Sequence, residues 1–231
     1  MTLLPLLFAA LAPAAPQVLA DDFERGLCLG GCRGWNWPAS QQIDGTLAVV
    51  GTPGHRRLLA RTGPRGERVP KAALIARPAK VALGGTIRVA FTLKVPHGAP
   101  LNSIHLVDIE CASCGEEGNP GIRLYLRDAR LRIDRSKIGE RHAWADGGAP
   151  QLRHGASHRI ELAVRTGFGA AAGAEVRLDG RLVLRGDGDT VVRPVGGAAA
   201  GADRIQIGLT ASSNSVPAAA FFDDIRVAIA R

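Results

Sequence analysis

Residues suited to acid–base chemistry gather in the middle of the chain, around its only tyrosine. Tyr125 stands between Arg123 and Arg127, each two residues away. Alternate residues of a β-strand project from one face, so these three side chains share a face if the segment is a strand. A phenol can transfer a proton, and a guanidinium binds a carboxylate at two points. The three side chains are therefore candidates for a site that binds an anionic ligand, and the alternative is the ordinary solvated outer face of a sandwich.

Further candidate groups lie on either side of this segment. His105, Asp108 and Glu110 belong to SIHLVDIE, which alternates like a strand, and His142 and Trp144 belong to the loop GERHAWADGGAPQLRHGAS. Strict alternation puts the two acids on one face and His105 on the other. The two histidines are candidate bases, and the acids are candidate substrate ligands. Trp144 either stacks on a sugar ring or packs at an edge of the fold.

The four cysteines form two closely spaced pairs, Cys28 with Cys32 and Cys111 with Cys114. In an exported protein an even number of cysteines predicts disulfides, and two short local loops are the simplest pairing. The same spacing would suit one zinc ion held by all four thiolates, which is the alternative.

The first twenty residues have the composition of an export signal. They carry no charged side chain, are rich in Leu, Ala and Pro, and end in a small-residue site, Val18-Leu19-Ala20. We expect cleavage after Ala20, which leaves residues 21–231 as a secreted or periplasmic domain. Since no later stretch approaches the length that a bilayer needs, we expect no transmembrane segment in the mature chain.

The net charge of +8 comes from arginine, with 25 Arg and only 4 Lys in the chain. Guanidinium groups suit carboxylate, sulfate or phosphate partners, and an arginine excess fits codon bias in a GC-rich genome equally well. The arginines are spread along the chain without a nucleic-acid-binding motif, and an exported protein rarely meets nucleic acid. This argues against a nucleic-acid partner.

Short alternating runs recur along residues 21–231, broken by Gly, Pro, Asn and Asp, and no window has a helical period. Two hairpins are expected, with turns at Asp128-Ala129 and Asp179-Gly180. The pattern predicts one all-β domain, a β-sandwich or jelly roll. If the polar faces of 123–132, 159–165 and 204–206 belong to one sheet, they form a basic surface around Tyr125. The predicted strands are Thr46–Val50, Ala72–Ala76, Thr86–Val95, Ser103–Glu110, Ile122–Arg127, Leu131–Asp134, His158–Arg165, Glu175–Leu178, Leu182–Leu184, Arg204–Thr210 and Ala220–Ile229.

The order of several segments resembles the concanavalin A-like jelly-roll superfamily of lectins, laminin-G-like modules, family-16 glucanases and polysaccharide lyases. The segments are DDFERG, IDGTLAVVG, HRIELAVRT, AEVRLDGRLVL and RIQIGLTASSNSVPAAAFFDDIRV. The resemblance spans nearly the whole domain, and the heparin-lyase-like and alginate-lyase-like members are most similar in size and in the long middle hairpin. It implies a single-domain sandwich of this fold, whereas function has to be argued from the site.

Two enzyme mechanisms of the superfamily can be compared with the residues present. Family-16 enzymes carry Glu-x-Asp-x-Glu on one strand, but here Leu106 stands at the position of the nucleophile before Asp108 and Glu110. This disfavours a retaining hydrolase. Jelly-roll lyases often carry Gln-x-His, of which this chain has His105 but Ser103 in place of the glutamine. The lyase pattern is therefore partly matched.

The resemblance also implies a structural calcium ion near the end of the chain. FDDIRV is similar to the final-strand motif in which family-16 members hold calcium, and Asp223 matches the ligand position. Calcium needs several oxygen ligands, and Glu24 near the start of the domain is a second candidate. The alternative is that the acids of this strand pair with nearby arginines.

Two functions follow as expectations. One is the activity that the resemblance to lyases implies, an exported polysaccharide lyase acting on an anionic, uronic-acid glycan. In it Arg123 and Arg127 bind the carboxylate, and Tyr125 and a histidine transfer protons. The other is a non-catalytic glycan-binding or envelope-associated module on the same scaffold.

Overall fold

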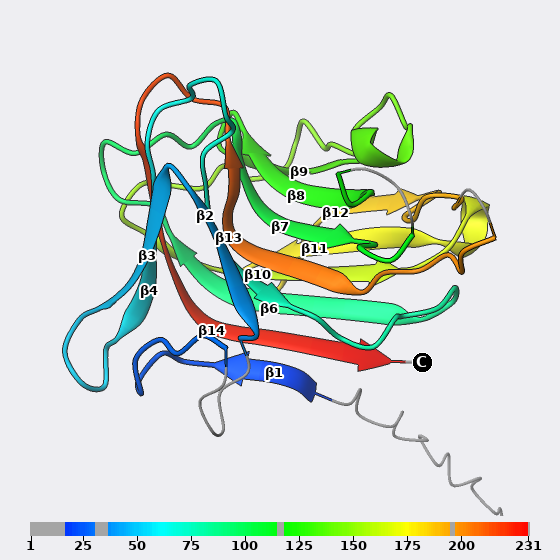
Figure 1. The fold of residues 1–231 in the computed structure, drawn as a ribbon. Helices are drawn as coiled ribbons and strands as arrows, with labels where there is room; N and C mark the ends of the chain where they lie inside the picture. The colour runs from blue at the N-terminus through cyan, green and yellow to red at the C-terminus, as the bar shows by residue number, and fades with distance from the viewer. Residues whose placement is uncertain (1–16, 31–36, 115–117, 195–196, 231) are drawn as a thin grey trace, which may run out of the picture.

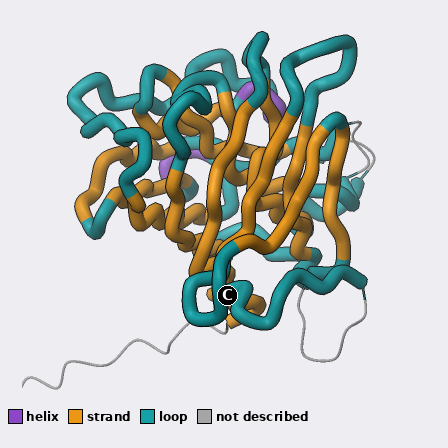
Figure 2. The backbone as a smooth tube through the Cα atoms, turned by 90° about the vertical axis from the view of Figure 1, so that its left-hand side faces the viewer, coloured by secondary structure: helices purple, strands orange, loops and turns teal. Residues whose placement is uncertain are grey.

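The computed structural model describes residues 17–30, 37–114, 118–194 and 197–230 as two β-sheets packed face to face. Figure 1 shows the two layers, with β13, β7, β8 and β9 in one and β14, β6, β10, β11 and β12 in the other. Seen from the side in Figure 2, strands make up most of the body and loops connect their ends; the short 3-10 turns are drawn in purple. The predicted all-β sandwich is confirmed.

The larger sheet contains eight antiparallel strands, in the order β12-β11-β10-β6-β14-β4-β3, with β1 also paired to β14. Its strands are β1 (Gln17–Asp21), β3 (Gly45–Val50), β4 (Arg57–Thr62), β6 (Thr86–Lys94), β10 (Ser157–Arg165), β11 (Gly173–Leu178), β12 (Arg181–Asp187) and β14 (Ala218–Ala230).

The smaller sheet contains six antiparallel strands, in the order β2-β5-β13-β7-β8-β9. Its strands are β2 (Ala39–Ile43), β5 (Lys71–Ala76), β7 (Ile104–Glu110), β8 (Gly121–Arg127), β9 (Arg130–Asp134) and β13 (Arg204–Ser212). The 3-10 turns are η1 (Ser136–Ile138), after β9, and η2 (Gly169–Ala171), before β11.

Alternation along the strands places one apolar face of each sheet in the core between them. Strand β6 shows it clearly, since Ile87, Val89, Phe91 and Leu93 are fully buried and the residues between them are not. Phe91 packs on Phe222 of β14, with ring centroids 5.5 Å apart. Burial of these side chains supplies most of the stabilisation of the sandwich.

The predicted hairpin turns are confirmed by their backbone angles. Asp128 and Ala129 have φ of 53° and 59°, and Asp179 and Gly180 have 51° and 79°. A two-residue turn with positive φ at both positions matches the twist of the strands it joins, which favours Asp and Gly there.

All eleven predicted strands are present, and three further strands had not been predicted. Strand β1 includes residues 17–20, which lie within the expected signal segment, and Leu19 is buried in the core. Strand β2 is mostly polar, and β4 buries Leu58, Leu59 and Ala60 in succession, so neither has a period of two. Among the described residues no helix is long and apolar enough to cross a membrane.

Trp144 closes the edge at which the two sheets meet. It forms an antiparallel bridge with Ile133 of β9, and its indole lies against the backbone of Gly186 in β12. The guanidinium of Arg135 lies over the indole ring, 4.2 Å from its centre. The side chain thus joins the edge strand of one sheet to the edge strand of the other.

The Gly186→Ala substitution should therefore destabilise the protein by about 2 kcal/mol, because overpacking forces neighbouring groups to shift. A Cβ at this position would lie 2.2 Å from Cδ2 of Trp144. Urea denaturation of this variant and of Gly66→Ala provides a matched comparison, since a Cβ at Gly66 meets no atom within 4 Å. Equal stability of the two variants would show that Trp144 does not pack on Gly186.

Candidate functional site

The smaller sheet turns a polar face away from the core, and this face carries most of the candidate residues. Register places Gln206, Asp108, Arg123 and Asp134 in one row across β13, β7, β8 and β9. His105, Tyr125 and Arg132 form a neighbouring row. We call this surface the polar face, and its residues are Lys71, His105, Asp108, Glu110, Arg123, Tyr125, Arg127, Arg130, Arg132, Asp134, Arg204, Gln206 and Thr210.

Two almost fully buried carboxylates occupy the centre of the polar face. Asp108 is 2% exposed and Glu110 is 1% exposed, and the two share a face as their spacing predicted. Lys137, from turn η1, places its Nζ 2.5 Å from Glu110 Oε1 and 3.8 Å from Asp108 Oδ2. A buried carboxylate without a cation would be very costly, so Lys137 is central to this arrangement.

Neighbours on β13 bind the remaining oxygens of these carboxylates. Gln206 Nε2 donates to Glu110 Oε2 at 2.8 Å, and Thr210 Oγ1 donates to Asp108 Oδ1 at 2.7 Å. Arg204 Nε lies 3.2 Å from Glu110 Oε2. The carboxylates are thus engaged within the protein, and binding a substrate hydroxyl would require them to give up a present contact.

Lys71 adds a further cation at the edge of this cluster. Burial lowers the pKa of its ammonium group, and the positive charges of Lys137 and Arg204 act in the same direction, while Asp108 and Glu110 oppose them. The three cations and two carboxylates leave the centre of the polar face with a net positive charge. A surface of this sign attracts anionic ligands.

His105 lies on the polar face, so its predicted placement opposite Asp108 and Glu110 is wrong. The pairing of β7 shifts register between His105 and Val107 against β8, and between Ile207 and Ala211 on the β13 side. An extra residue in one strand of a pair reverses the alternation beyond it. This irregularity brings a histidine beside Tyr125, which strict alternation could not predict.

The His105 ring stacks on the Tyr125 ring, with centroids 5.3 Å apart and planes inclined by 20°. Burial, together with the positive charge of Arg123, lowers the pKa of His105 to about 4. The imidazole is therefore neutral at pH 7, and its Nδ1 is buried with no hydrogen-bond partner among the described residues. A base with so low a pKa has little driving force to remove a proton from carbon.

Arg123, the predicted carboxylate ligand, is already engaged. Its guanidinium forms an ion pair with Asp134 and donates to Ser136 Oγ at 2.9 Å. Burial would raise the pKa of Asp134, but the Ser136 N–H and the Arg123 charge outweigh it and lower that pKa. Arg127 is exposed and has no ion pair among the described residues, so it is the more available of the two predicted arginines.

Arg130 and Arg132 extend the cationic end of the polar face. Arg127 and Arg130 are cross-strand neighbours, and Arg132 is the neighbour of Tyr125. Arg132 makes one loose ion pair with Asp128, at 3.4 Å. An exposed pair of this kind contributes little to stability, so the Arg132 guanidinium can turn toward a ligand at small cost.

The other two residues predicted in the middle loop lie apart from the His105–Tyr125 pair. His142 is exposed and makes no hydrogen bond or ion pair to another described residue. Trp144 has its indole against Gly186, in the arrangement expected for edge packing. Neither residue is brought into contact with Tyr125 by any interaction in the described part of the chain.

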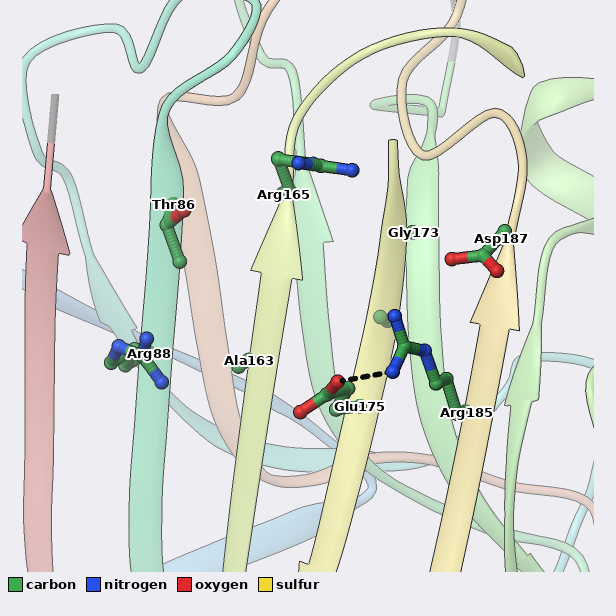
Figure 3. A pocket seen from close by; sticks show the side chains of 9 residues that line it. Thr86, Arg88, Ala163, Arg165, Gly173, Glu175, Arg185 and Asp187 are labelled. Carbon is green, nitrogen blue, oxygen red and sulfur yellow. Dashed lines mark ion pairs between the residues drawn. The ribbon is translucent and has the colours of Figure 1, made fainter. Parts of the chain in front are cut away.

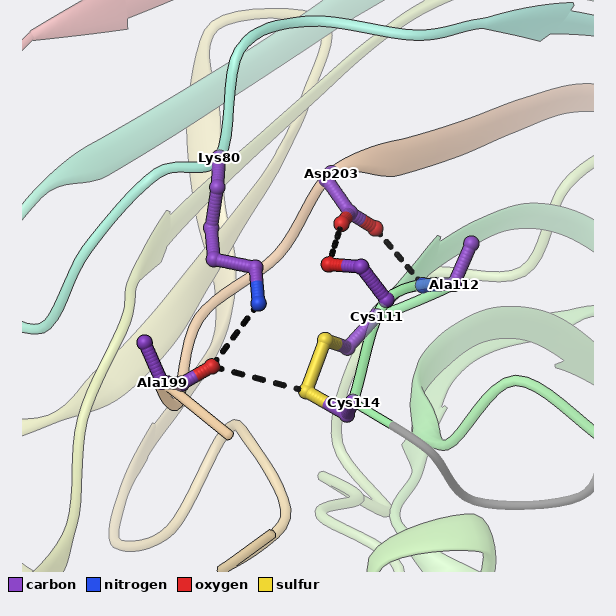
Figure 4. The surroundings of a disulfide bond; sticks show 7 residues. Lys80, Cys111, Ala112, Cys114, Ala199 and Asp203 are labelled. Carbon is purple, nitrogen blue, oxygen red and sulfur yellow. Dashed lines mark hydrogen bonds between the residues drawn. A yellow bond between two sulfur atoms is a disulfide. The ribbon is translucent and has the colours of Figure 1, made fainter. Parts of the chain in front are cut away.

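Cys111 and Cys114 form a disulfide that ends strand β7 directly after Glu110. Figure 4 shows its surroundings, where Asp203 accepts hydrogen bonds from the Ala112 N–H and the Ser113 hydroxyl, and Lys80 donates to the carbonyl of Ala199. This bond excludes a zinc site made from all four thiolates. The other predicted pair includes Cys32, which lies outside the described residues.

The candidate calcium ligands lie near each other, but Glu24 already has other partners. Its two carboxylate oxygens accept hydrogen bonds from the backbone N–H groups of Gly54 and Arg56, at 2.6 and 2.8 Å. Burial raises the pKa of Asp223, and the charge of Glu24 contributes in the same direction. No group of three or more His, Cys, Asp or Glu side chains suited to a metal occurs in the described ranges. Asp223 Oδ1 in turn accepts a hydrogen bond from the Asp224 N–H at 2.9 Å, so both candidates already have partners within the protein.

Calcium binding stays a prediction that chelation can test. Excess chelator should lower the melting temperature of the wild-type protein, because a ligand bound only by the native state stabilises it. Asp223→Asn should remove most of that response. An unchanged melting temperature after exhaustive chelation would contradict a structural calcium ion.

The cations that neutralise Asp108 and Glu110 were not among the predicted site residues. Arg204 and Gln206 were recognised as a polar face in RIQIGLT, but their contact with Glu110 depends on the pairing of β13 with β7. Lys137 comes from a turn outside the sheet, and Lys71 from the first position of β5. The chain has only four lysines, and two of them, Lys71 and Lys137, lie at this cluster. Their rarity could have marked them as candidate partners of the buried acids.

No protein-family model and no curated protein sequence matches the chain. Several solved structures share its fold. An endo-β-1,4-glucuronan lyase from the fungus Trichoderma reesei has a TM-score of 0.66 and 14% identity, covering 92% of this chain and 95% of the lyase. The cellulose-induced protein Cip1 has a TM-score of 0.62 and 18% identity, over 92% of this chain and 96% of Cip1. Alginate lyase AlgAT5, from polysaccharide lyase family 7, has a TM-score of 0.56 and 13% identity, over 83% and 85% of the two chains.

These similarities confirm the predicted concanavalin A-like jelly roll. The chain has the fold of the glucuronan lyase, of Cip1 and of family-7 alginate lyases. Proteins that share a fold at such identities differ widely in chemistry, so activity has to be argued from the polar face itself.

Proposed function

We propose that this protein is an exported binder of acidic polysaccharide, and that the polar face contacts uronic-acid units. The observation that carries the proposal is the stacked His105–Tyr125 pair, which lies beside Arg132 and is followed by Arg127 on the same face. An aromatic ring offers a surface for a sugar, and exposed guanidinium groups suit its carboxylate. The shared fold with enzymes named as glucuronan and alginate lyases supports the choice of ligand class.

The ion pairs and the pKa of the candidate catalytic groups favour binding over elimination. Elimination from a uronate requires a cation to neutralise the carboxylate, a base for the C5 proton and an acid for the leaving oxygen. Arg123 is paired with Asp134, so it is not free to neutralise the carboxylate. The pKa of His105 is lowered to about 4, so its imidazole is a weak base for the C5 proton. Asp108 and Glu110 are held by internal partners and support the face rather than act on a ligand.

A polysaccharide lyase is the second candidate, and one arrangement favours it. His105, Tyr125 and Arg123 lie on adjacent strands of one face, which the lyase hypothesis required. In that reaction Tyr125 would transfer the proton and Arg127 or Arg132 would bind the carboxylate, since Arg123 is engaged elsewhere. His142 has no role in either proposal.

Export is part of the proposal, because acidic polysaccharides of this kind are met outside the cytoplasm. Residues 1–16 of the expected signal lie outside the described residues, and residues 17–20 pair with β14 in the structure. Cleavage after Ala20 would remove four of the five residues of β1. The mass of the secreted chain will therefore show where processing occurs.

Incubation with a panel of uronic-acid polysaccharides separates the two candidates. Each polymer is tested for binding and for the ultraviolet absorbance of the unsaturated sugar that elimination leaves. We expect binding of at least one polyuronate without a rise in absorbance. A rise that Tyr125→Phe abolishes would establish the lyase instead, and no binding to any acidic polymer would contradict both.

A further inference from the structure

The larger sheet has a pocket of its own on the side away from the polar face. It has a volume of about 280 Å³ and is lined by residues of β6, β10, β11 and β12. Figure 3 shows the side chains that surround it, with Thr86 and Arg88 on β6, Arg165 on β10, Glu175 on β11, and Arg185 and Asp187 on β12. Nothing in the proposed function uses this pocket.

The pocket results from small residues in the middle of two charged rows. In the first row, register aligns Arg165, Gly173 and Asp187 across three strands. In the second row, Ala163 lies between Arg88 and Glu175. Each row thus has an arginine on one side, a small residue at the bottom and a carboxylate on the other side.

Both arginines of these rows have free guanidinium groups. Arg88 and Arg165 are exposed, and neither forms an ion pair or a side-chain hydrogen bond with another described residue. In Figure 3 the Arg165 side chain points from β10 toward β11, on the side of Asp187, whose carboxylate points back toward Gly173. The two groups face each other across the pocket without making an ion pair.

The wall opposite Arg88 and Arg165 is formed by β11 and β12, and an ion pair holds its side chains in place. Glu175 Oε1 lies 3.5 Å from Arg185 Nη1, and this ion pair orients both side chains along the pocket. A Cβ at Gly173 would lie 2.5 Å from the carbonyl oxygen of Gly186, so this position admits no side chain unless the backbone shifts. A ligand would therefore rest on backbone at Gly173, between a cationic and an acidic wall.

We propose that this pocket is a second ligand site, and that it binds a single sugar-acid unit. The free guanidinium groups of Arg88 and Arg165 each suit a carboxylate, which accepts bidentate hydrogen bonds. Carboxylates such as Asp187 and Glu175 accept hydrogen bonds from hydroxyl groups. A ligand with a carboxylate at one end and hydroxyls at the other satisfies both walls, whereas inorganic sulfate satisfies only one. The volume suits one monosaccharide rather than an extended polymer.

This site is separate from the polar face and does not depend on the function proposed there. If both sites bind acidic sugars, the protein can contact two polysaccharide chains on opposite sides, or one chain at two points. Either arrangement would raise the apparent affinity for polymer above that for a single unit.

The test is a titration of the full-length secreted protein with sodium glucuronate, followed by amide NMR, with glucose and sodium sulfate as comparison ligands. We expect glucuronate to shift amides of β10, β11 and β12, and to bind more tightly than either comparison ligand. Arg88→Gln and Arg165→Gln should each weaken binding about tenfold, the loss expected for one charge-assisted contact. Arg181→Gln removes an exposed arginine of β12 that does not line the pocket, so it should leave the affinity unchanged.

The outcomes distinguish this site from the polar face. Chemical-shift changes confined to amides of β7 and β8 would overturn the second site while supporting the proposed function. Shifts confined to β10–β12 that persist in Tyr125→Ala would support the second site alone. Equal losses of glucuronate affinity in Arg165→Gln and Arg181→Gln would also overturn the proposal, as would equal affinities for glucuronate and sulfate. Binding would then depend only on the overall positive charge of the protein.

Discussion

Replacing Lys137 with methionine should lower the free energy of unfolding by about 3 kcal/mol, the loss expected when a buried carboxylate loses its partner. Lys137 is the cation closest to Glu110 and also approaches Asp108. Both carboxylates are almost completely buried, so solvent screens their charges poorly once the ammonium group is removed. Arg204 still contacts Glu110 in the variant, which keeps the loss from being larger.

A matched control for this substitution lies four residues further along. Arg141 is exposed and forms no ion pair in the described part of the chain, so Arg141→Met removes the same charge without unpairing an acid. Its cost should be below about 0.5 kcal/mol. Adding Glu110→Gln to Lys137→Met should restore part of the stability, since it removes the unpaired charge. Equal urea midpoints for Lys137→Met and Arg141→Met would contradict the role given to Lys137.

The second large effect is a pH dependence of stability that comes from His105. Its pKa is 6.5 in the unfolded chain and about 4 in the folded protein, because burial disfavours the charged ring. Between these values the unfolded chain binds a proton that the native protein does not. Stability therefore decreases as the pH falls from 6.5 to 4 and is unaffected by this group above that window, for a total on the order of 3 kcal/mol.

His105→Phe isolates this contribution, because it keeps an aromatic ring against Tyr125 and cannot be protonated. The free energy of unfolding of the variant should vary less with pH between 6.5 and 4 than that of the wild type. His142→Phe removes an exposed histidine and should leave the wild-type profile in place. Parallel profiles for wild type and His105→Phe would show that His105 is not held neutral by the fold.

The sequence allowed much of the fold to be predicted, because most strands bury one face and alternate accordingly. The predictions failed where burial had another pattern. Strand β4 buries three successive residues, and the irregularity in β7 moved His105 to the face of Asp108 and Glu110. A register shift depends on the pairing of strands and has no period in the sequence that could reveal it.

The candidate site was predictable only in part, for a related reason. Tyr125, Arg123 and Arg127 belong to one strand, so their shared face followed from spacing alone. The partners that decide their availability come from elsewhere, as Asp134 does on β9 and Lys137 does on η1. Spacing identified the side chains that share a face, whereas their ion pairs depend on which strands and turns become neighbours.

One affinity measurement shows whether the polar face binds acidic polysaccharide. Binding of a polyuronate is measured for wild type and for a variant combining Tyr125→Ala with Arg127→Gln, with a neutral glucan as the comparison polymer. We predict that the wild type binds the polyuronate and not the neutral glucan, and that the variant binds at least about tenfold more weakly. Equal affinity of wild type and variant for the polyuronate, with both proteins folded, would show that the polar face does not bind it.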